Sequence, residues 1–173
     1  VEGALRDVAL VPLLMGDQCK QPTLLLREAL ARTFHHERHL VVASSDLSHY
    51  HEDSVARVLD GVLISHVRSF EPEGLLESID AGRTAACGGG PLAAAMFFAR
   101  AVGAASSRVL SYATSGDTSG DRSHVVGYLA AAFHGARAES GEHDLDRLER
   151  RELLSLARRA LEAHYAGDEP PEL

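Results

Sequence analysis

The sequence lacks several features that would place it among membrane, secreted or nucleic-acid-binding proteins. None of its apolar runs approaches the ~18 residues of a membrane-spanning helix, and its first residues do not have the pattern of a signal peptide. Two cysteines are too few for a disulfide framework, so a cytoplasmic location is expected. With 25 acidic and 17 basic residues, the formal net charge of −8 argues against nucleic acid or an anionic membrane as partner.

Several catalytic motifs are also absent. There is no G-x-S-x-G nucleophile elbow, and the glycines at 88–90 are followed by Pro91 rather than by the lysine of a phosphate-binding loop. His36 and His39 are three residues apart, whereas the zinc motif H-E-x-x-H places its histidines four apart. The H-x-E at 35–37 is not followed by the P-C-x-x-C of zinc deaminases, so we interpret this cluster as a solvated helix end.

The length of 173 residues allows one domain with a full core and a short appendage. The chain begins with Val1 and enters an apolar run within a few residues. We interpret it as a piece of a longer protein and expect part of any functional site to lie upstream.

Hydrophobic periodicity predicts alternating strands and helices in the first half of the chain. A strand over 8–15, a helix over 22–34 and a strand over 39–45 favour a parallel strand pair joined by a crossover. A long helix over 52–69 is predicted next. Its apolar face is predicted to consist of Val55, Val58, Leu59, Val62, Leu63 and Val67.

The second half predicts more helices and an antiparallel strand pair. The expected elements are a helix over 72–79, a Gly-rich loop over 82–90, a buried Ala-rich helix over 91–102, and strands over 108–114 and 125–133. The expected fold class is α/β, with a mixed, partly parallel sheet flanked by helices. Residues 135–144 have the composition of a linker, and helical periodicity resumes at 145.

The stretch Leu40–Tyr50 changes from apolar, β-branched residues to hydroxyls, a carboxylate and an imidazole. We interpret the apolar half as a strand buried on both faces. The polar half would then emerge at the carboxyl end of this strand, where open α/β sheets place their ligands. The functional site is therefore expected here.

Asp46 and His49 are three residues apart within this stretch. A carboxylate beside an imidazole fixes its tautomer and raises its basicity, as in acid/base pairs and metal sites. Alternatively, Asp46 or a neighbouring serine caps the following helix. Both interpretations agree with the spacing.

Cys87 lies in the Gly-rich loop just before a helix whose first turn contains Pro91. Backbone donors and the helix dipole favour a thiolate there, the form that binds metals or attacks electrophiles. Alternatively, Cys87 is a small apolar residue that fills a gap beside two alanines. Cys19 has no such context, and we interpret it as structural.

The loop over 114–123 contains Asp117 and Asp121 with several hydroxyls and two glycines. Such a loop lines a pocket or binds a hard cation, or it forms a plain turn. The composition fits each of these equally well.

Three motifs together carry a family resemblance. They are S-S-D-L-S-H-Y at 44–50, A-C-G at 86–88 before Pro91, and Y-A-T-S-G-D at 112–117 with V-V-G-Y at 125–128. In order and spacing they resemble the MEMO family, whose bacterial branch is the AmmeMemoRadiSam system protein B. The tail over 148–160 is similar to the opening helix of AMMECR-type domains. The resemblance implies the C-terminal part of a MEMO-like domain over 1–134, a linker over 135–144, and the start of a truncated AMMECR-type domain over 145–173.

The resemblance also implies a site. The family fold is similar to class III extradiol dioxygenases, which hold non-haem iron with two histidines and a glutamate. MEMO proteins place a cysteine at the position of that glutamate, and here it is Cys87. His49 falls at the position of the acid/base histidine, and Asp46 lines the same pocket. We expect further pocket residues as well, namely Ser45, Tyr50 and Asp117. The two histidine ligands belong to the N-terminal portion, which this chain lacks.

The implied function is that of a metal-dependent redox or oxygenase-like enzyme, with iron or copper bound in the full-length protein. A thiolate ligand favours copper. This part of the chain is not expected to retain the metal by itself. The alternative is a non-catalytic protein whose pocket binds a metal, a peptide or a partner. The implied partners are a fused AMMECR-type domain and a radical-SAM protein of the same system.

Overall fold

The computed structural model describes residues 10–34 and 39–135. The chain divides into two compact units, Val1–Leu14 with Ser140–Leu173, and Met15–Glu139. Of the first unit only residues 10–14 are described, and they have no regular secondary structure. The expected linker beyond residue 135, the C-terminal helix and the histidines at 35 and 36 lie outside the described residues.

The helices of the second unit agree with the predicted ones to within a few residues. The structure has α1 (Lys20–Thr33), α2 (Asp53–Ser69), α3 (Pro72–Asp80), α4 (Gly89–Ala101) and a short α5 (Ser115–Ser119), which was not predicted. None of the helices among the described residues is long and apolar enough to cross a membrane.

Within residues 10–34 and 39–135 the sheet has three strands, β1 (His49–His51), β2 (Ser106–Thr114) and β3 (Val125–His134), in the order β1-β3-β2. Both pairs are antiparallel. β2 and β3 form the predicted antiparallel pair, with Ser106 opposite His134 and Thr114 opposite Gly127. β3 is therefore the central strand, and β1 pairs only with its first residues.

The predicted parallel pair is wrong for the described residues. Residues 39–48 contain no strand, and residues 10–15 have no strand either. Leu40 and Val42 are 75% and 66% exposed rather than buried. Within the described residues, this segment pairs with β3 only near residues 47–51, so its earlier part forms no ladder and is not a strand. Over 40–45 the backbone makes no backbone hydrogen bond to another described residue.

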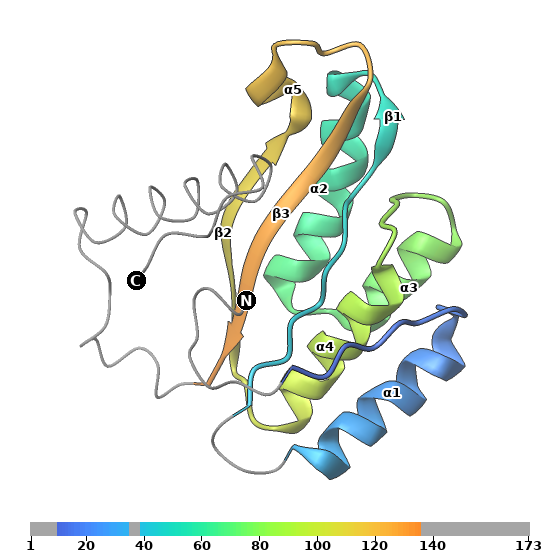
Figure 1. The fold of residues 1–173 in the computed structure, drawn as a ribbon, viewed down its shortest axis with the longest axis vertical. Coiled ribbons are helices and arrows are strands. Elements are labelled where there is room, and N and C mark those ends of the chain that lie inside the picture. The colour runs from blue at the N-terminus through green and yellow to red at the C-terminus, as the bar shows by residue number, and fades with distance from the viewer. Residues whose placement is uncertain (1–9, 35–38, 136–173) are drawn as a thin grey trace, which may run out of the picture. The chain divides into compact units, whose positions relative to one another are not determined.

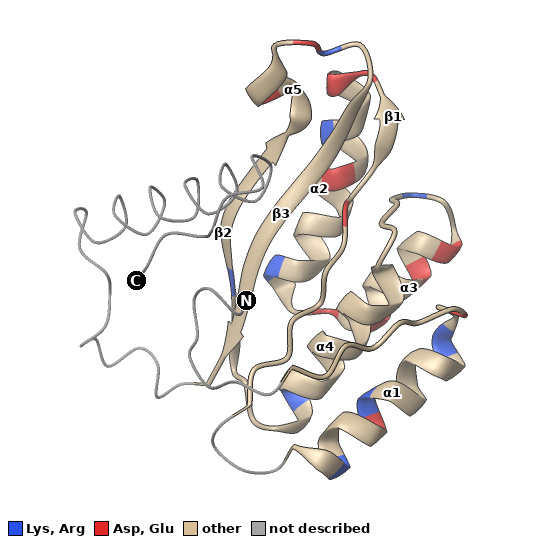
Figure 2. Ribbon diagram, in the orientation of Figure 1, with Lys and Arg blue, Asp and Glu red and all other residues tan. Residues whose placement is uncertain are grey.

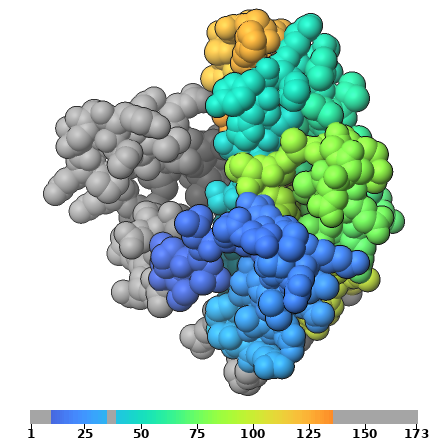
Figure 3. All heavy atoms as spheres, turned by 90° about the vertical axis from the view of Figure 1, so that its right-hand side faces the viewer, coloured from blue at the N-terminus to red at the C-terminus, as the bar shows by residue number. Residues whose placement is uncertain are grey.

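The helices are stacked outward from the sheet (Figure 1). α2 packs against β2 and β3, α3 packs against α2, and α4 lies between α3 and α1. The face seen in Figure 3 is formed by α1, α3 and the region of α2 and β1. The core where these layers meet consists of Leu47, Leu63, Val67, Leu75, Leu76, Ala93 and Met96.

The buried face of α2 differs from the predicted one. Val55 and Val58 were assigned to the apolar face, yet they are 45% and 70% exposed. The buried positions follow the helical spacing of three and four residues and include two carboxylates: Asp53, Ala56, Asp60, Leu63 and Val67. Hydropathy alone does not predict this face, because the two aspartates are polar. They are buried here because other groups hydrogen-bond their carboxylates.

Replacing Leu63 with alanine should lower the free energy of unfolding by about 2–5 kcal/mol, because its side chain is fully buried in the core. Val58→Ala on the exposed side of the same helix should change it by less than about 0.5 kcal/mol. Urea denaturation of both variants measures the difference. Equal losses would contradict the observed orientation of α2.

Candidate functional site

The stretch that carries the predicted site residues is attached to the start of β3. The Leu47 N–H donates to the Gly127 carbonyl (2.9 Å), and the Gly127 N–H donates to the Ser48 carbonyl (3.0 Å). Beyond this pairing the register of β1 shifts between His49 and His51. Tyr50, between them, has a φ of 61°, in the left-handed region that non-glycine residues seldom adopt. The pairing of β1 with β3 is therefore irregular at the predicted site.

The Cys87 loop lies directly beside this stretch. The Cys87 N–H donates to the Asp46 carbonyl (3.1 Å), and the Asp46 N–H donates to the Cys87 sulfur (3.2 Å). Ser45 joins the same contact, because its hydroxyl donates to the Asp46 carbonyl (2.7 Å) and accepts from the Gly88 N–H (2.8 Å). Two segments about 40 residues apart in sequence are thus held together by three hydrogen bonds, from Cys87 N–H, Asp46 N–H and Gly88 N–H.

A close backbone approach makes this contact possible. A Cβ added to Gly88 would lie 2.6 Å from the Ser44 carbonyl oxygen, which a real Cβ does not do. On the other side of the loop, the Gln18 side chain donates to the Cys87 carbonyl (2.8 Å) and accepts from the Gly90 N–H (3.0 Å). Sequence reasoning missed Gln18, because a glutamine just before a helix carries no signal of a partner some 70 residues away.

Asp46 and His49 form a side-chain pair. The Asp46 Oδ2 and His49 Nε2 atoms are 3.4 Å apart, and the side chains are 48% and 30% exposed. The helix-cap alternative does not hold, because α2 begins at Asp53 and its N-cap position is Glu52. The pair is accessible to solvent and lies on the same stretch as the Cys87 contact.

The gap-filling alternative for Cys87 does not hold either. The residue is exposed, and its thiol is free. Its sulfur accepts the Asp46 N–H, so the lone pairs of the sulfur face the stretch that carries His49. Cys19, the other cysteine, is also free and exposed, and its N–H donates to Asp17 before α1.

Tyr50 and Asp117 lie in different surroundings. The Tyr50 side chain is 80% exposed. Asp117 forms a capping box with Thr114 at the start of α5 and two hydrogen bonds with the Arg57 guanidinium (2.7 and 2.8 Å). Asp121 accepts the N–H and hydroxyl of Ser123 in a turn.

Asp53 is the centre of a charged cluster at this end of the sheet, where the α5–β3 connection meets the start of α2 (Figure 2). Its carboxylate accepts hydrogen bonds from Arg57 Nε (2.9 Å), the Thr114 hydroxyl (2.6 Å) and Arg122 (2.6 Å). The Arg57 and Thr114 hydrogen bonds lower the pKa of Asp53 from 3.8 to about 2. The Thr114 N–H and Arg57 lower the pKa of Asp117 in the same way.

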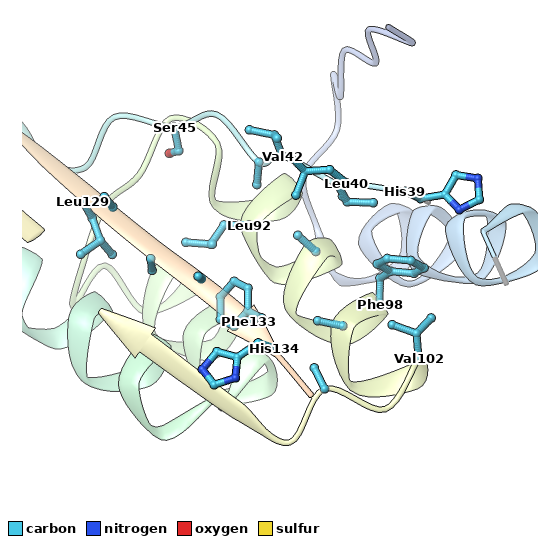
Figure 4. A pocket seen from close by; sticks show the side chains of 18 of the residues that line it. His39, Leu40, Val42, Ser45, Leu92, Phe98, Val102, Leu129, Phe133 and His134 are labelled. Atoms are coloured by element: carbon cyan, nitrogen blue, oxygen red, sulfur yellow. The ribbon is translucent and has the colours of Figure 1, made fainter. Parts of the chain in front are cut away.

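An apolar groove of about 570 Å³ lies between the extended segment 39–47, α4 and β3. Figure 4 shows Leu92, Phe98 and Phe133 among its walls, with Ser45 at one end. Of the site residues described above, Ser45 alone lines it. The groove is therefore next to the Asp46–Cys87 contact but is chemically distinct from it.

The donor set in the described residues does not form a complete metal site. No group of three or more His, Cys, Asp or Glu side chains among them is arranged to hold a metal ion. Cys87 offers a thiol, and the Asp46–His49 pair offers a carboxylate and an imidazole. Any metal would need ligands from outside the described residues.

Comparison with known proteins assigns the family. The model of the Memo-like protein family matches residues 1–132. The chain belongs to the Memo-like family. It is 36% identical over 124 residues to a MEMO1 family protein of Nitrosopumilus maritimus, a match that covers 72% of this chain and 45% of the relative.

Two further relatives from archaea show the same pattern. A MEMO1 family protein of Methanobrevibacter smithii is 34% identical over 73% of this chain and 46% of the relative. One from Methanopyrus kandleri is 39% identical over 54% of this chain and 33% of the relative. The chain thus spans less than half the length of these curated relatives.

The charged cluster predicts an acid-sensitive contribution to stability. Because the pKa of Asp53 is lower in the folded chain than in the unfolded one, the unfolded state takes up the proton first as the pH falls. The stabilisation is complete above about pH 4 and is lost between about pH 4 and pH 2. Urea denaturation across this range should show a flatter pH dependence for Asp53→Asn than for the wild type. Identical slopes would contradict the arrangement.

Proposed function

We propose that this chain supplies one side of a metal-dependent redox or oxygenase-like site. The proposal rests on the hydrogen-bonded contact between Asp46 and Cys87, which places a free thiol against the stretch that carries His49. A thiolate beside a carboxylate–imidazole pair combines a soft metal ligand with a group able to move protons. Bound iron or copper would supply the redox chemistry.

Cys87 is assigned as the metal ligand from this chain. The residue is exposed, and its sulfur accepts one backbone N–H, from Asp46. Gln18 and Ser45 hold the loop on both sides of it and so fix the position of the sulfur. A thiolate in place of a third hard ligand favours copper over an iron site made of imidazole and carboxylate alone.

His49 is assigned as the proton-transfer group, and Asp46 orients it. The Asp46 carboxylate lies 3.4 Å from the His49 Nε2 atom, which leaves Nδ1 to exchange a proton with a substrate or water. The pair is partly exposed, as an acid/base group must be to reach its substrate.

The remaining ligands are proposed to be two histidines from the part of the domain that lies upstream of the matched region. The relatives are more than twice as long as the stretches they share with this chain. The class III extradiol dioxygenase architecture is proposed for the complete domain. If no two histidines occur within the preceding ~150 residues of the natural protein, the metal assignment is overturned.

A second candidate is a non-catalytic binding protein, favoured by the apolar groove beside Ser45. The neighbouring segment 40–45 is extended, and its backbone is unpaired within the described residues, so it can accept an added strand. In this role a peptide would bind along the groove, and Asp46 and His49 would have no chemical task.

The finer family placement is also a proposal. The motif resemblance supports the bacterial AmmeMemoRadiSam system protein B, with a fused AMMECR-type domain and a radical-SAM protein as partners. Two free cysteines and a net charge of −8 support a cytoplasmic protein that binds neither nucleic acid nor membrane.

Cys87→Ser in the full-length protein should reduce bound copper or iron, with an affinity loss of at least about tenfold, since even changes around a ligand cost about that much. Cys19→Ser is the matched control, because Cys19 is equally free and exposed but lies outside the contact. Elemental analysis after anaerobic purification measures the stoichiometry. Unchanged metal content in Cys87→Ser would remove its role as a ligand.

His49→Ala should lower turnover by about 10²–10⁴-fold while leaving the metal content near normal, because a proton-transfer group is lost but no ligand. His51→Ala, an exposed neighbour in β1, should have little effect. Loss of metal in His49→Ala would instead identify this side chain as a ligand. Full turnover in His49→Ala would remove its proton-transfer role, whereas a wild-type protein that loads metal but shows no turnover would favour the non-catalytic candidate.

A further inference from the structure

Helix α2 carries a fully buried carboxylate, Asp60, for which the proposed function has no use. Its Oδ1 atom accepts the Ser48 N–H (3.0 Å), and its Oδ2 atom accepts the Tyr112 hydroxyl (2.7 Å). A buried carboxylate is costly to keep in a core unless its oxygens are hydrogen-bonded, as both are here. A leucine at this position would fill the core without the desolvation penalty of a carboxylate. Packing alone therefore does not explain why the residue is an aspartate.

The N–H that Asp60 accepts belongs to Ser48, the residue immediately before His49. The Ser48 carbonyl accepts the Gly127 N–H, so both polar groups of Ser48 are fixed, one by α2 and one by β3. The Ser48 side chain does not contribute, because its buried hydroxyl has no hydrogen-bond partner among the described residues. The backbone that leads into His49 is therefore held by Asp60 on one side and by Gly127 on the other.

The surroundings of Asp60 allow little movement. A Cβ added to Gly127 would overlap the Asp60 carboxylate, so the strand and the carboxylate are in direct contact. Burial and the Asp60 hydrogen bond raise the pKa of Tyr112 well above its usual range, so the phenol stays protonated and remains a donor. The Arg57 guanidinium covers the Tyr112 ring, with 5.7 Å between its Cζ atom and the ring centroid.

We propose that Asp60 is a positioning residue for His49: by accepting the Ser48 N–H, it fixes the backbone that holds the His49 imidazole against Asp46. The proposal rests on the assigned role of His49 and adds the group that sets its geometry. Directly after His49, the backbone adopts a left-handed conformation at Tyr50. Among the described residues, Asp60 is the α2 side chain that hydrogen-bonds the backbone next to His49, so without it this backbone has no such support from α2.

The first test uses the wild-type chain. Hydrogen exchange followed by NMR should show the Ser48 amide protected well beyond an unstructured peptide, because its acceptor is a buried carboxylate. Exchange at the rate of an unstructured peptide would overturn the proposal, whether or not any variant folds.

The second test compares variants at the two oxygens of the same carboxylate. Asp60→Ala removes the Ser48 contact, and Tyr112→Phe removes only the phenol contact. Relative to the Leu63 amide in the core of α2, Ser48 should exchange ~10–100-fold faster in Asp60→Ala and should be little changed in Tyr112→Phe. Asp60→Asn keeps an oxygen that can accept the Ser48 N–H and should restore most of the protection.

The third readout is the His49 ring itself, followed by its ¹⁵N and ¹H resonances. In Asp60→Ala these resonances should shift and broaden as the ring leaves Asp46, whereas in Asp60→Asn and Tyr112→Phe they should stay near the wild-type positions. A folded Asp60→Ala variant with unchanged His49 signals, or a Tyr112→Phe variant that shifts them equally, would overturn the positioning role. Failure of the proposed function would appear elsewhere, as unchanged metal content in Cys87→Ser and full turnover in His49→Ala.

Discussion

The candidate site depends on the reciprocal hydrogen bonds between Asp46 and Cys87. Each residue donates its N–H to the other, one to a carbonyl and one to a sulfur, so the two loops are held in one relative position. Ser45 and Gln18 support the contact from opposite sides. Without this contact, the loop with the Cys87 thiol would not be held beside the segment with the His49 imidazole, and the two groups could not belong to one site.

Buried carboxylates form the second organising element. Asp53 and Asp60 lie two turns apart on the inner face of α2, and each is satisfied by partners from the sheet side. Asp53 connects α2 to the start of α5 through Thr114, and Asp60 connects α2 to the stretch before His49. Helix α2 is therefore joined by polar contacts to the end of β2 and to the segment before His49. Hydrogen bonds fix the relative position of these elements, whereas apolar packing alone would allow them to slide along one another.

The sequence predicted local structure well and long-range structure poorly. The helices now labelled α1 to α4 follow from apolar periodicity, and the β2–β3 pair follows from two apolar runs with a short connection. The strand over 39–45 was wrong, because composition shows that a run can form a strand but not whether a neighbour is present to pair with it. Asp46, His49 and Cys87 were identifiable by residue type. Gln18 and Asp60 were not, because their roles lie in contacts with distant backbone groups.

The extended segment over Leu40–Ser45 has a consequence for handling the chain. It contains no charged residue and no proline, and Leu40 and Val42 are largely exposed. Proteins usually protect a free strand edge with charges, prolines or bulges, because an unprotected edge pairs with any other extended chain. Within the described residues, this run of six therefore presents an unprotected backbone edge that another extended chain can pair with.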